Sequence, residues 1–238
     1  MFGSIAISLD SDSSESDNDD TRLCRRNIRD ATNVLDLPEE RFIASFRVNK
    51  EVFVMLLKEI TPNLKVAYRN THIPAPTKLA TFLLFLATGG YQTSIGNECF
   101  SSISKSQVSK VITELLEIFE RYLCSKWIKL EDNNDSEVKE FFYNYGGIPG
   151  VVGCVDGTHV RIKAPGNERN HLYYNRKGYF SINVMLICDH NMVITYVDAR
   201  HPGANHDSFI WDQSAAEHYF KSNYLNGRRY TWLLGIII

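Results

Sequence analysis

The sequence predicts two structural parts, a helical region followed by an α/β domain. Apolar residues recur at helical spacing through residues 37–123, which is typical of helices that bury one face. Beyond residue 150 the pattern changes to short apolar runs that are rich in β-branched residues and end in Gly, Pro, Asp or Asn, as strands do. With 238 residues, of which 44% are hydrophobic, the chain can bury a core for one or two domains.

The first segment is expected to lack structure. Residues 1–20 contain six acidic residues and no Lys or Arg, and such a composition cannot bury enough apolar surface to fold. We therefore expect a disordered acidic tail, which is either a phosphorylation target or a solvated leader. The predicted segments, in order, are this tail over 1–36, the helical region over 37–124, a linker over 125–150 and the α/β domain over 151–238.

Three helices are expected near the end of the helical region, over residues 78–88, 94–100 and 107–123. Ser106 is the expected N-cap of the third helix. Because a tight polar turn precedes that helix, the segment fits a helix-turn-helix, although a plain helical bundle fits it too. In the first case the start of the third helix offers these side chains to DNA: Lys105, Gln107 and Lys110.

The α/β domain is predicted from four strand-like runs and one helix. The runs cover 151–155, 181–188, 192–199 and 230–234, and the helix covers 206–220. A polar turn at residues 189–191 joins the second run to the third as a hairpin. The resulting order, which is strand, hairpin, helix and strand, is that of an α/β domain.

Two aspartates are candidate metal ligands. Asp156 follows the first strand-like run, where a carboxylate at the end of a buried strand suits a divalent cation. The alternative is that Asp156 and Gly157 simply form a turn. Asp207 stands near the start of the helix over 206–220, where it is either a ligand or the N-cap. The residues alone leave both choices open.

A block of basic and aromatic residues follows the first strand. In RNHLYYNRKGYFSINV, over residues 169–184, Arg and Lys alternate with Tyr and Phe. Basic groups bind phosphates and aromatic rings stack on bases, so Arg176 and Lys177 are candidate nucleic-acid contacts. The same pattern fits a strand edge whose tyrosines face the core, and the sequence does not decide between the two.

Three motifs together resemble the Harbinger-type DDE transposases and the nucleases derived from them. They are GVVGCVDGTHVRIKAP, YYNRKGYFSINVMLICD and VDARHPGANHDSFIW, in this order. The resemblance, which covers the chain from Leu37 to Gly235, implies an RNase H-like fold and phosphodiester cleavage assisted by Mg²⁺ or Mn²⁺. It assigns Asp156, in DGTH, and Asp207, in PGANHD, as catalytic, metal-binding residues. It leaves the block that contains Arg176 and Lys177 to position the nucleic-acid strand.

The chain departs from the resembled family after the motif WLLG. There the family continues with an aspartate and later a glutamate on a helix, whereas this chain has three isoleucines. We therefore expect an α/β domain truncated at its C-terminal end, an incomplete metal site, no nuclease activity, and an apolar end without a covering layer. Two functions follow: a metal-dependent nuclease derived from a DDE transposase, or a catalytically inactive DNA-binding or partner-binding protein.

Composition argues against several other classes. No apolar run reaches the ~18 residues of a membrane span, no signal peptide is recognisable, and the five cysteines form no CxxC pair. A zinc knuckle and a disulfide framework are therefore not expected, and a reducing compartment fits. We expect the nucleus as the location, with the cytoplasm as a second one. The expected partners are DNA and a protein that carries a separate DNA-binding domain.

Overall fold

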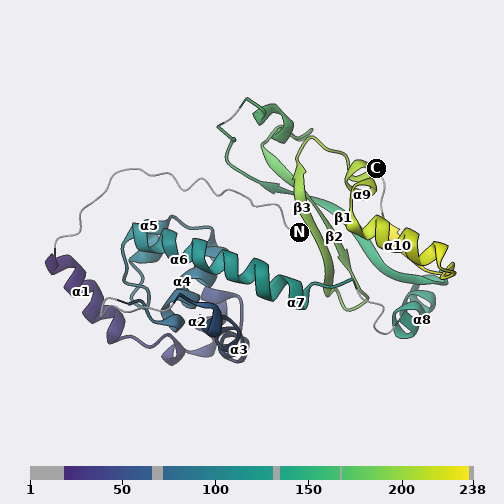
Figure 1. Cartoon of the computed structure of the whole chain (residues 1–238). Coiled ribbons are helices and arrows are strands. Elements are labelled where there is room, and N and C mark those ends of the chain that lie inside the picture. The colour runs from purple at the N-terminus through teal and green to yellow at the C-terminus, as the bar shows by residue number, and fades with distance from the viewer. Residues whose placement is uncertain (1–18, 66–71, 131–134, 167, 236–238) are drawn as a thin grey trace. The chain divides into compact units, whose positions relative to one another are not determined.

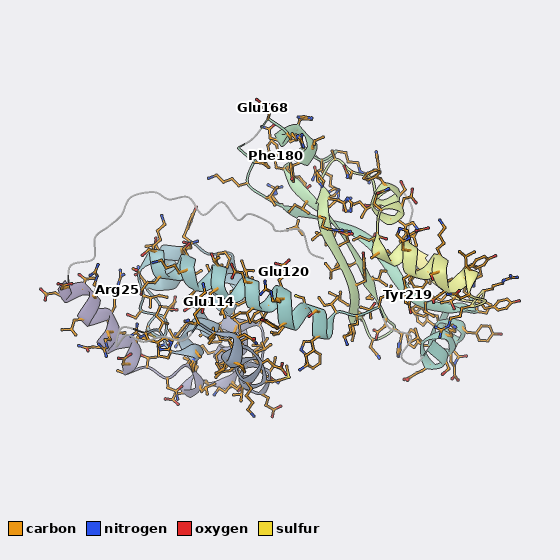
Figure 2. All side chains as sticks on the ribbon, in the orientation of Figure 1. Arg25, Glu114, Glu120, Glu168, Phe180 and Tyr219 are labelled. Carbon is orange, nitrogen blue, oxygen red and sulfur yellow. The ribbon has the colours of Figure 1, made fainter. Side chains whose placement is uncertain are left out.

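The computed structural model describes residues 19–65, 72–130, 135–166 and 168–235 (Figure 1). The chain divides between Cys124 and Ser125 into two compact units. We call them the helical unit and the α/β unit, and Figure 2 shows the side chains of both. No helix among the described residues is long and apolar enough to cross a membrane.

The helical unit encloses one hydrophobic core. Phe42, Phe46 and Phe53 contact one another there, with ring centroids 4.7, 5.4 and 6.2 Å apart, and Ile112 and Leu115 are fully buried. The elements of this unit are α1 (Asp19–Asp30), η1 (Val34–Asp36), α2 (Glu39–Phe46), α3 (Lys50–Ile60), η2 (Thr61–Asn63), α4 (Ala75–Thr88), α5 (Gln92–Gly96), α6 (Lys105–Ile118) and η3 (Phe119–Cys124), a π-helical turn.

Helix α1 corrects the expected disordered tail over residues 1–36. Residues 1–18 lie outside the described residues, but Asp19–Asp30 is helical. Opposite charges one turn apart favour this helix, as where the Arg26 guanidinium lies 3.4 Å from the Asp30 carboxylate. The acidic segment therefore leads into a helix whose charges pair along its own surface.

Three helices near the end of the helical unit pack on one another, as expected. Contacts join α4 to α5, α4 to α6 and α5 to α6. The N-cap of α6 is Ser104 rather than Ser106, because Ser104 has the extended backbone that precedes a helix. The two hydroxyl oxygens lie 3.1 Å apart. Helix α6 therefore begins two residues earlier than the sequence predicted.

The predicted linker over residues 125–150 is largely helical. It contains α7 (Ser125–Trp127) and α8 (Asp135–Gly146), and residues 131–134 lie outside the described residues. Helix α8 packs against the first strand of the sheet, and Val138 of this helix is buried. The segment was predicted as a linker because its polar residues obscure the single apolar face that this packing covers.

The α/β unit contains a mixed sheet of four strands in the order β3-β2-β1-β4. Strand β2 pairs antiparallel with both β1 and β3, whereas β4 runs parallel to β1. The expected α/β class is therefore confirmed. The elements that follow α8 are β1 (Val151–Arg161), η4 (Asn170–Tyr173), β2 (Ser181–Cys188), β3 (Ile194–Pro202), α9 (Asp207–Asp212), α10 (Ala215–Leu225) and β4 (Trp232–Gly235).

Strand β1 is longer than predicted, and this excludes a turn at Asp156 and Gly157. Pairing with β2 continues without a register shift from Cys154 to Arg161. The sequence misled here because Asp-Gly favours turns locally, whereas pairing with β2 holds both residues in an extended conformation.

The second core lies between the sheet and the two helices that follow β3. Ile187 of β2, Ile210 of α9 and Ala216 of α10 are buried together, and Leu233 of β4 packs against them. Leu233 thus has a covering layer, contrary to expectation, although Leu234 beside it is exposed. The predicted helix over 206–220 is two helices, because the Ser214 hydroxyl accepts a hydrogen bond from the Glu217 amide and starts α10.

Candidate functional site

Asp156 lies within the central strand β1, opposite Leu186 of β2. Its side chain is exposed, and its Oδ1 accepts a hydrogen bond from the Gly157 amide at 2.8 Å. Because side chains alternate along a strand, Asp156 projects from the face opposite to that of Val155, which packs into the core beside α9 and α10. The carboxylate is therefore open to a ligand from solvent.

Asp207 is the first residue of α9, and His206 occupies the N-cap position. The alternative in which Asp207 is the N-cap is therefore wrong. Its carboxylate instead turns toward the sheet, where its Oδ1 accepts a hydrogen bond of 2.7 Å from the Asn183 amide group. A half-buried carboxylate at the start of a helix is favoured by the positive end of the helix.

The carboxylate of Asp207 rests directly on Gly157. A Cβ atom at Gly157 would lie 2.7 Å from the carboxyl carbon of Asp207, and closer still to one oxygen. Since consecutive Cα atoms are ~3.8 Å apart, the Asp156 Cα lies within roughly 8 Å of that carboxyl carbon. The structure thus places the Asp207 carboxylate against the residue that follows Asp156 on β1, although the Asp156 side chain starts on the opposite face of the strand.

Asn183 is a site residue that the sequence reasoning missed. It is only 2% exposed, and besides Asp207 its amide donates to the Asn205 carbonyl at 3.0 Å. Its own carbonyl oxygen, Oδ1, is buried and accepts no hydrogen bond within the described part of the chain. The sequence feature that could have indicated this residue is an asparagine within the mainly apolar run SINVMLIC. A buried polar side chain in a strand needs hydrogen-bond partners.

The pairing register aligns Asn183 with a histidine on each side. His159 of β1 and His201 of β3 are its cross-strand neighbours, so the three side chains share the face that Asp207 covers. His159 Nδ1 lies 3.0 Å from the Ser181 hydroxyl, which also accepts a hydrogen bond from Asn175 at 2.8 Å. These contacts hold the His159 ring in one orientation beside Asp207.

The basic pair Arg176 and Lys177 lies near this same group of side chains. Burial lowers the pKa of His159, the positive charges of Lys177 and Arg176 lower it further, and the negative charge of Asp207 opposes them. Both basic side chains are exposed. The site thus combines carboxylates with a positive field, which attracts phosphate groups.

The basic and aromatic block is not a core-facing strand edge. Its first part forms η4, and Tyr174 after it is half exposed and contacts Phe180, with ring centroids 5.1 Å apart. The ring of Tyr179 lies under the Arg161 guanidinium, 4.4 Å from its centroid. The tyrosines therefore line the surface next to the basic residues instead of filling the core.

Asp198, another acidic residue of the PGANHD region, is engaged in an ion pair. Its side chain is 1% exposed and accepts a hydrogen bond of 2.9 Å from Arg200 Nε and a second from the same guanidinium. Burial alone would raise the pKa of Asp198, but the hydrogen bonds and charge of Arg200, with His201, hold it below its usual value. This carboxylate is therefore paired within the protein.

The Asp198 pair predicts a loss of stability in acid. The pKa of Asp198 is lower in the folded chain than in the unfolded one. The ionised carboxylate therefore contributes fully to the free energy of unfolding above the ordinary pKa of about 3.9. This contribution is lost as the pH falls through the pKa of the folded chain. Urea unfolding between about pH 6 and pH 2 should show a steeper decline for the unmodified chain than for Asp198→Asn. The exposed Asp212→Asn should retain the steep decline; equal slopes for all three would contradict the prediction.

The other three predicted contact residues lie in the helical unit. Lys105 and Lys110 are exposed at the start of α6, and Gln107 between them is half-buried. Gln107 and Lys110, three residues apart, lie on the same side of α6. The structure therefore gathers the predicted site residues in two places, one in each unit.

The carboxylates of the α/β unit do not form a crowded cluster. Across residues 19–65, 72–130, 135–166 and 168–235, no three His, Cys, Asp or Glu side chains lie close enough together to hold a metal ion. Gly235 of β4 pairs with Val155, one residue before Asp156. The isoleucines that follow, on which the expected loss of an acidic ligand rests, lie outside the described residues.

Most of the sheet, with Asp156, Asp207 and the basic block, lies in a segment that is similar to DDE endonucleases. Residues 155–234 match the family model described as DDE superfamily endonuclease, and both candidate aspartates fall within the match. The resemblance inferred from the three motifs, to Harbinger-type nucleases derived from DDE transposases, is thereby confirmed.

The chain is also similar over most of its length to curated proteins named "Putative nuclease HARBI1". It is 29% identical to the one from Homo sapiens over 204 residues and 28% identical to the one from Bos taurus over 202 residues, in each case 84% of this chain and 56% of the relative. Identity to the one from Xenopus laevis is 31% over 170 residues, 70% of this chain and 47% of the relative. The chain thus spans about half the length of these relatives. No solved structure matches it significantly.

Proposed function

We propose that this chain contributes the catalytic aspartates of a metal-dependent nuclease that cleaves DNA phosphodiester bonds. The observation that carries the proposal is the Asp207 carboxylate held on Gly157, next to Asp156. The DDE superfamily endonuclease match over the same residues supports it. We further propose that the domain is RNase H-like, with Asp156 on its central strand.

The donors at this site suit a hard divalent cation. Asp156 and Asp207 offer carboxylate oxygens, and the Asn183 carbonyl oxygen is buried without a hydrogen-bond donor among the described residues. Mg²⁺ is commonly held by one or two carboxylates while keeping several waters, so this set fits Mg²⁺ or Mn²⁺ in chemistry. Asp156 and Asp207 would hold the ions, which when bound activate a water and stabilise the leaving oxygen.

The remaining residues of the site act on the DNA strand and on the carboxylates. Arg176 and Lys177 attract the phosphate backbone from the surface beside His159. Asn183 holds one oxygen of Asp207, leaving the other directed away from the amide. Hydrogen bonds of this kind fix a ligand before the cation arrives, which supports both affinity and geometry.

The helical unit is proposed to bind DNA as a helix-turn-helix. Helices α4, α5 and α6 contact one another in the required order, and exposed lysines at residues 105 and 110 stand at the start of α6. We place this activity in the nucleus, with the cytoplasm as a second location. A protein with a separate DNA-binding domain is the proposed partner.

Metal-dependent cleavage of supercoiled plasmid DNA tests the nuclease proposal. The nuclease proposal requires that the chain nicks the plasmid with Mg²⁺ or Mn²⁺ but not with a chelator, and that Asp156→Asn and Asp207→Asn lower the rate about 100-fold or more. Asp212→Asn, which changes an exposed carboxylate on α9, is the matched control. Cleavage that persists unchanged in Asp156→Asn would refute the assignment.

A second function, DNA binding without cleavage, is favoured by one observation. The described residues contain no group of three metal-ligating side chains, so a bound ion would take most of its ligands from water. In this case the chain should bind duplex DNA with an affinity that falls with salt, while metal ions produce no nicking. The plasmid assay and a binding titration on the same preparation separate the two functions.

A further inference from the structure

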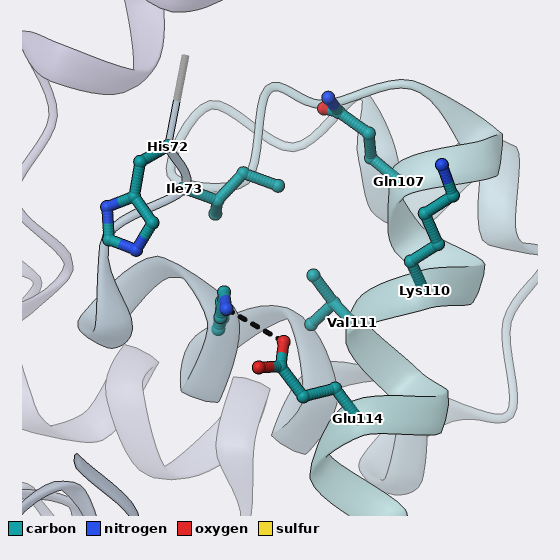
Figure 3. A pocket seen from close by; sticks show the side chains of 7 residues that line it. His72, Ile73, Gln107, Lys110, Val111 and Glu114 are labelled. Atoms are coloured by element: carbon teal, nitrogen blue, oxygen red, sulfur yellow. Dashed lines mark hydrogen bonds and ion pairs between the residues drawn. The ribbon is translucent and has the colours of Figure 1, made fainter. Parts of the chain in front are cut away.

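A pocket of about 230 Å³ opens in the helical unit between the start of α4 and α6. Figure 3 shows Gln107 and Lys110 extending over it from α6, with His72 on the other side. Ile73 and Val111 form its apolar part. Two of the side chains predicted to contact DNA thus belong to a concave site.

A buried ion pair lies at the base of this pocket. Lys78 is 7% exposed, and its ammonium lies 2.7 Å from Glu114 Oε2. The other oxygen of Glu114 accepts a hydrogen bond from the Lys65 amide at 3.0 Å. Both oxygens of Glu114 accept hydrogen bonds, so its carboxylate is held in place. The Lys78 ammonium has three N–H groups and therefore retains donors for a ligand.

The charges around the pocket favour an anion. Two lysines and one glutamate line it, which leaves a net positive charge. Helix α4 begins beside the pocket after Pro74, with no side chain capping it and no acidic residue in its first turn. The positive end of a fourteen-residue helix therefore adds to the field of the lysines.

We propose that this pocket seats one phosphate group of the DNA backbone. Lys110 and Gln107 would bind the phosphate from α6 and His72 from the opposite wall, while the Lys78–Glu114 pair fixes the base. The inference rests on the proposed DNA binding by α6 and adds to it a fixed anchoring point for the backbone. A seated phosphate would set the depth and angle at which α6 meets the duplex, because phosphate contacts determine register and orientation.

The test measures DNA affinity as a function of salt for the full chain. Fluorescence anisotropy with a short labelled duplex, between about 50 and 300 mM NaCl, gives the slope of log affinity against log salt. We expect Lys110→Met to reduce that slope by about one unit, the loss of one phosphate contact. The control is Lys58→Met, an exposed lysine of α3 that does not line the pocket, which should leave the slope unchanged.

A double-mutant cycle then asks whether Gln107 and Lys110 act on the same phosphate. We expect Gln107→Leu to weaken binding severalfold in the unmodified chain and much less in the Lys110→Met background, since residues that share a partner are not additive. Fully additive losses of affinity would show that Gln107 and Lys110 make separate contacts, which would overturn the pocket proposal. Thermal unfolding of each variant alongside Lys58→Met identifies any change that comes from folding.

Two further outcomes separate this proposal from the function on which it rests. If the chain shows no salt-dependent DNA binding, both the DNA-binding proposal and the pocket proposal fail. If binding persists but Lys110→Met behaves as Lys58→Met does, only the pocket proposal fails. Inorganic phosphate is the probe for the alternative source. If titration shows millimolar phosphate binding that Lys110→Met abolishes, while Lys110→Met and Lys58→Met bind DNA with the same affinity and salt slope, the pocket takes the free anion and the assignment to the backbone is overturned.

Discussion

Gly157→Ala is expected to displace the Asp207 carboxylate and to lower the affinity for Mn²⁺ about 10- to 100-fold. The new methyl group would stand 2.7 Å from the carboxyl carbon of Asp207, a distance that forces one of them to move. The backbone at Gly157 is held by its pairing with Met185 of β2, so the side chain of Asp207 moves more easily than the strand. The change acts on the site without adding or removing a charge.

Calorimetric titration of the purified chain with Mn²⁺, with circular dichroism as the check on folding, measures this effect. Gly166→Ala is the matched control, because a Cβ at Gly166 meets no atom within 4 Å. We expect Gly166→Ala to retain the full affinity and Gly157→Ala to keep the spectrum of the folded chain. Equal Mn²⁺ affinity in the two variants would mean that Asp207 does not bind the ion.

Asn183→Leu is expected to lower the free energy of unfolding by about 2–3 kcal/mol at neutral pH. Leucine is close to asparagine in size but donates no hydrogen bond. The substitution leaves one oxygen of Asp207 and the carbonyl of Asn205 without the donor that each now has, at 2.7 and 3.0 Å. Leaving a charged acceptor unpaired in a partly buried place costs more than the hydrogen bond itself contributes.

Urea denaturation measures this loss, and Asn191→Leu provides the comparison, because Asn191 is exposed at the turn between β2 and β3. The stabilities of Asn191→Leu and the unmodified chain should agree within about 0.5 kcal/mol. If Asn183→Leu were as stable as Asn191→Leu, the buried amide would contribute nothing to holding Asp207. Titration of the folded Asn183→Leu variant with Mn²⁺ should show weaker binding as well.

Elements whose patterns are local were predictable from the sequence. The apolar run over 181–188 forms β2 with the predicted bounds, because a short apolar run bounded by turn residues favours a strand by itself. The three helices before Cys124 were also expected, with shifts of a few residues at their ends. In each case the information lies within the segment, so no knowledge of its neighbours was needed.

The features that were missed depend on distant parts of the chain. A turn at Asp156 and Gly157 is one of the two alternatives that the sequence allows, because the sequence does not reveal that β2 pairs with both residues. Asn183 went unnoticed because its importance arises from Asp207, 24 residues away. The same reason applies to α8, whose apolar face becomes meaningful only when β1 is there to cover it. Register and packing decide these positions, and neither can be read from a single segment.

The contact between Gly157 and Asp207 links the histories of the two positions. As long as the carboxylate is selected, any side chain at residue 157 is excluded by the space that the carboxylate occupies. Once selection on Asp207 is relaxed, a smaller residue at position 207 leaves room for a side chain at position 157. Substitutions of Gly157 are then tolerated. If Asp207 binds a metal ion as proposed, lineages in which that binding is lost should lose the glycine together with, or soon after, the aspartate.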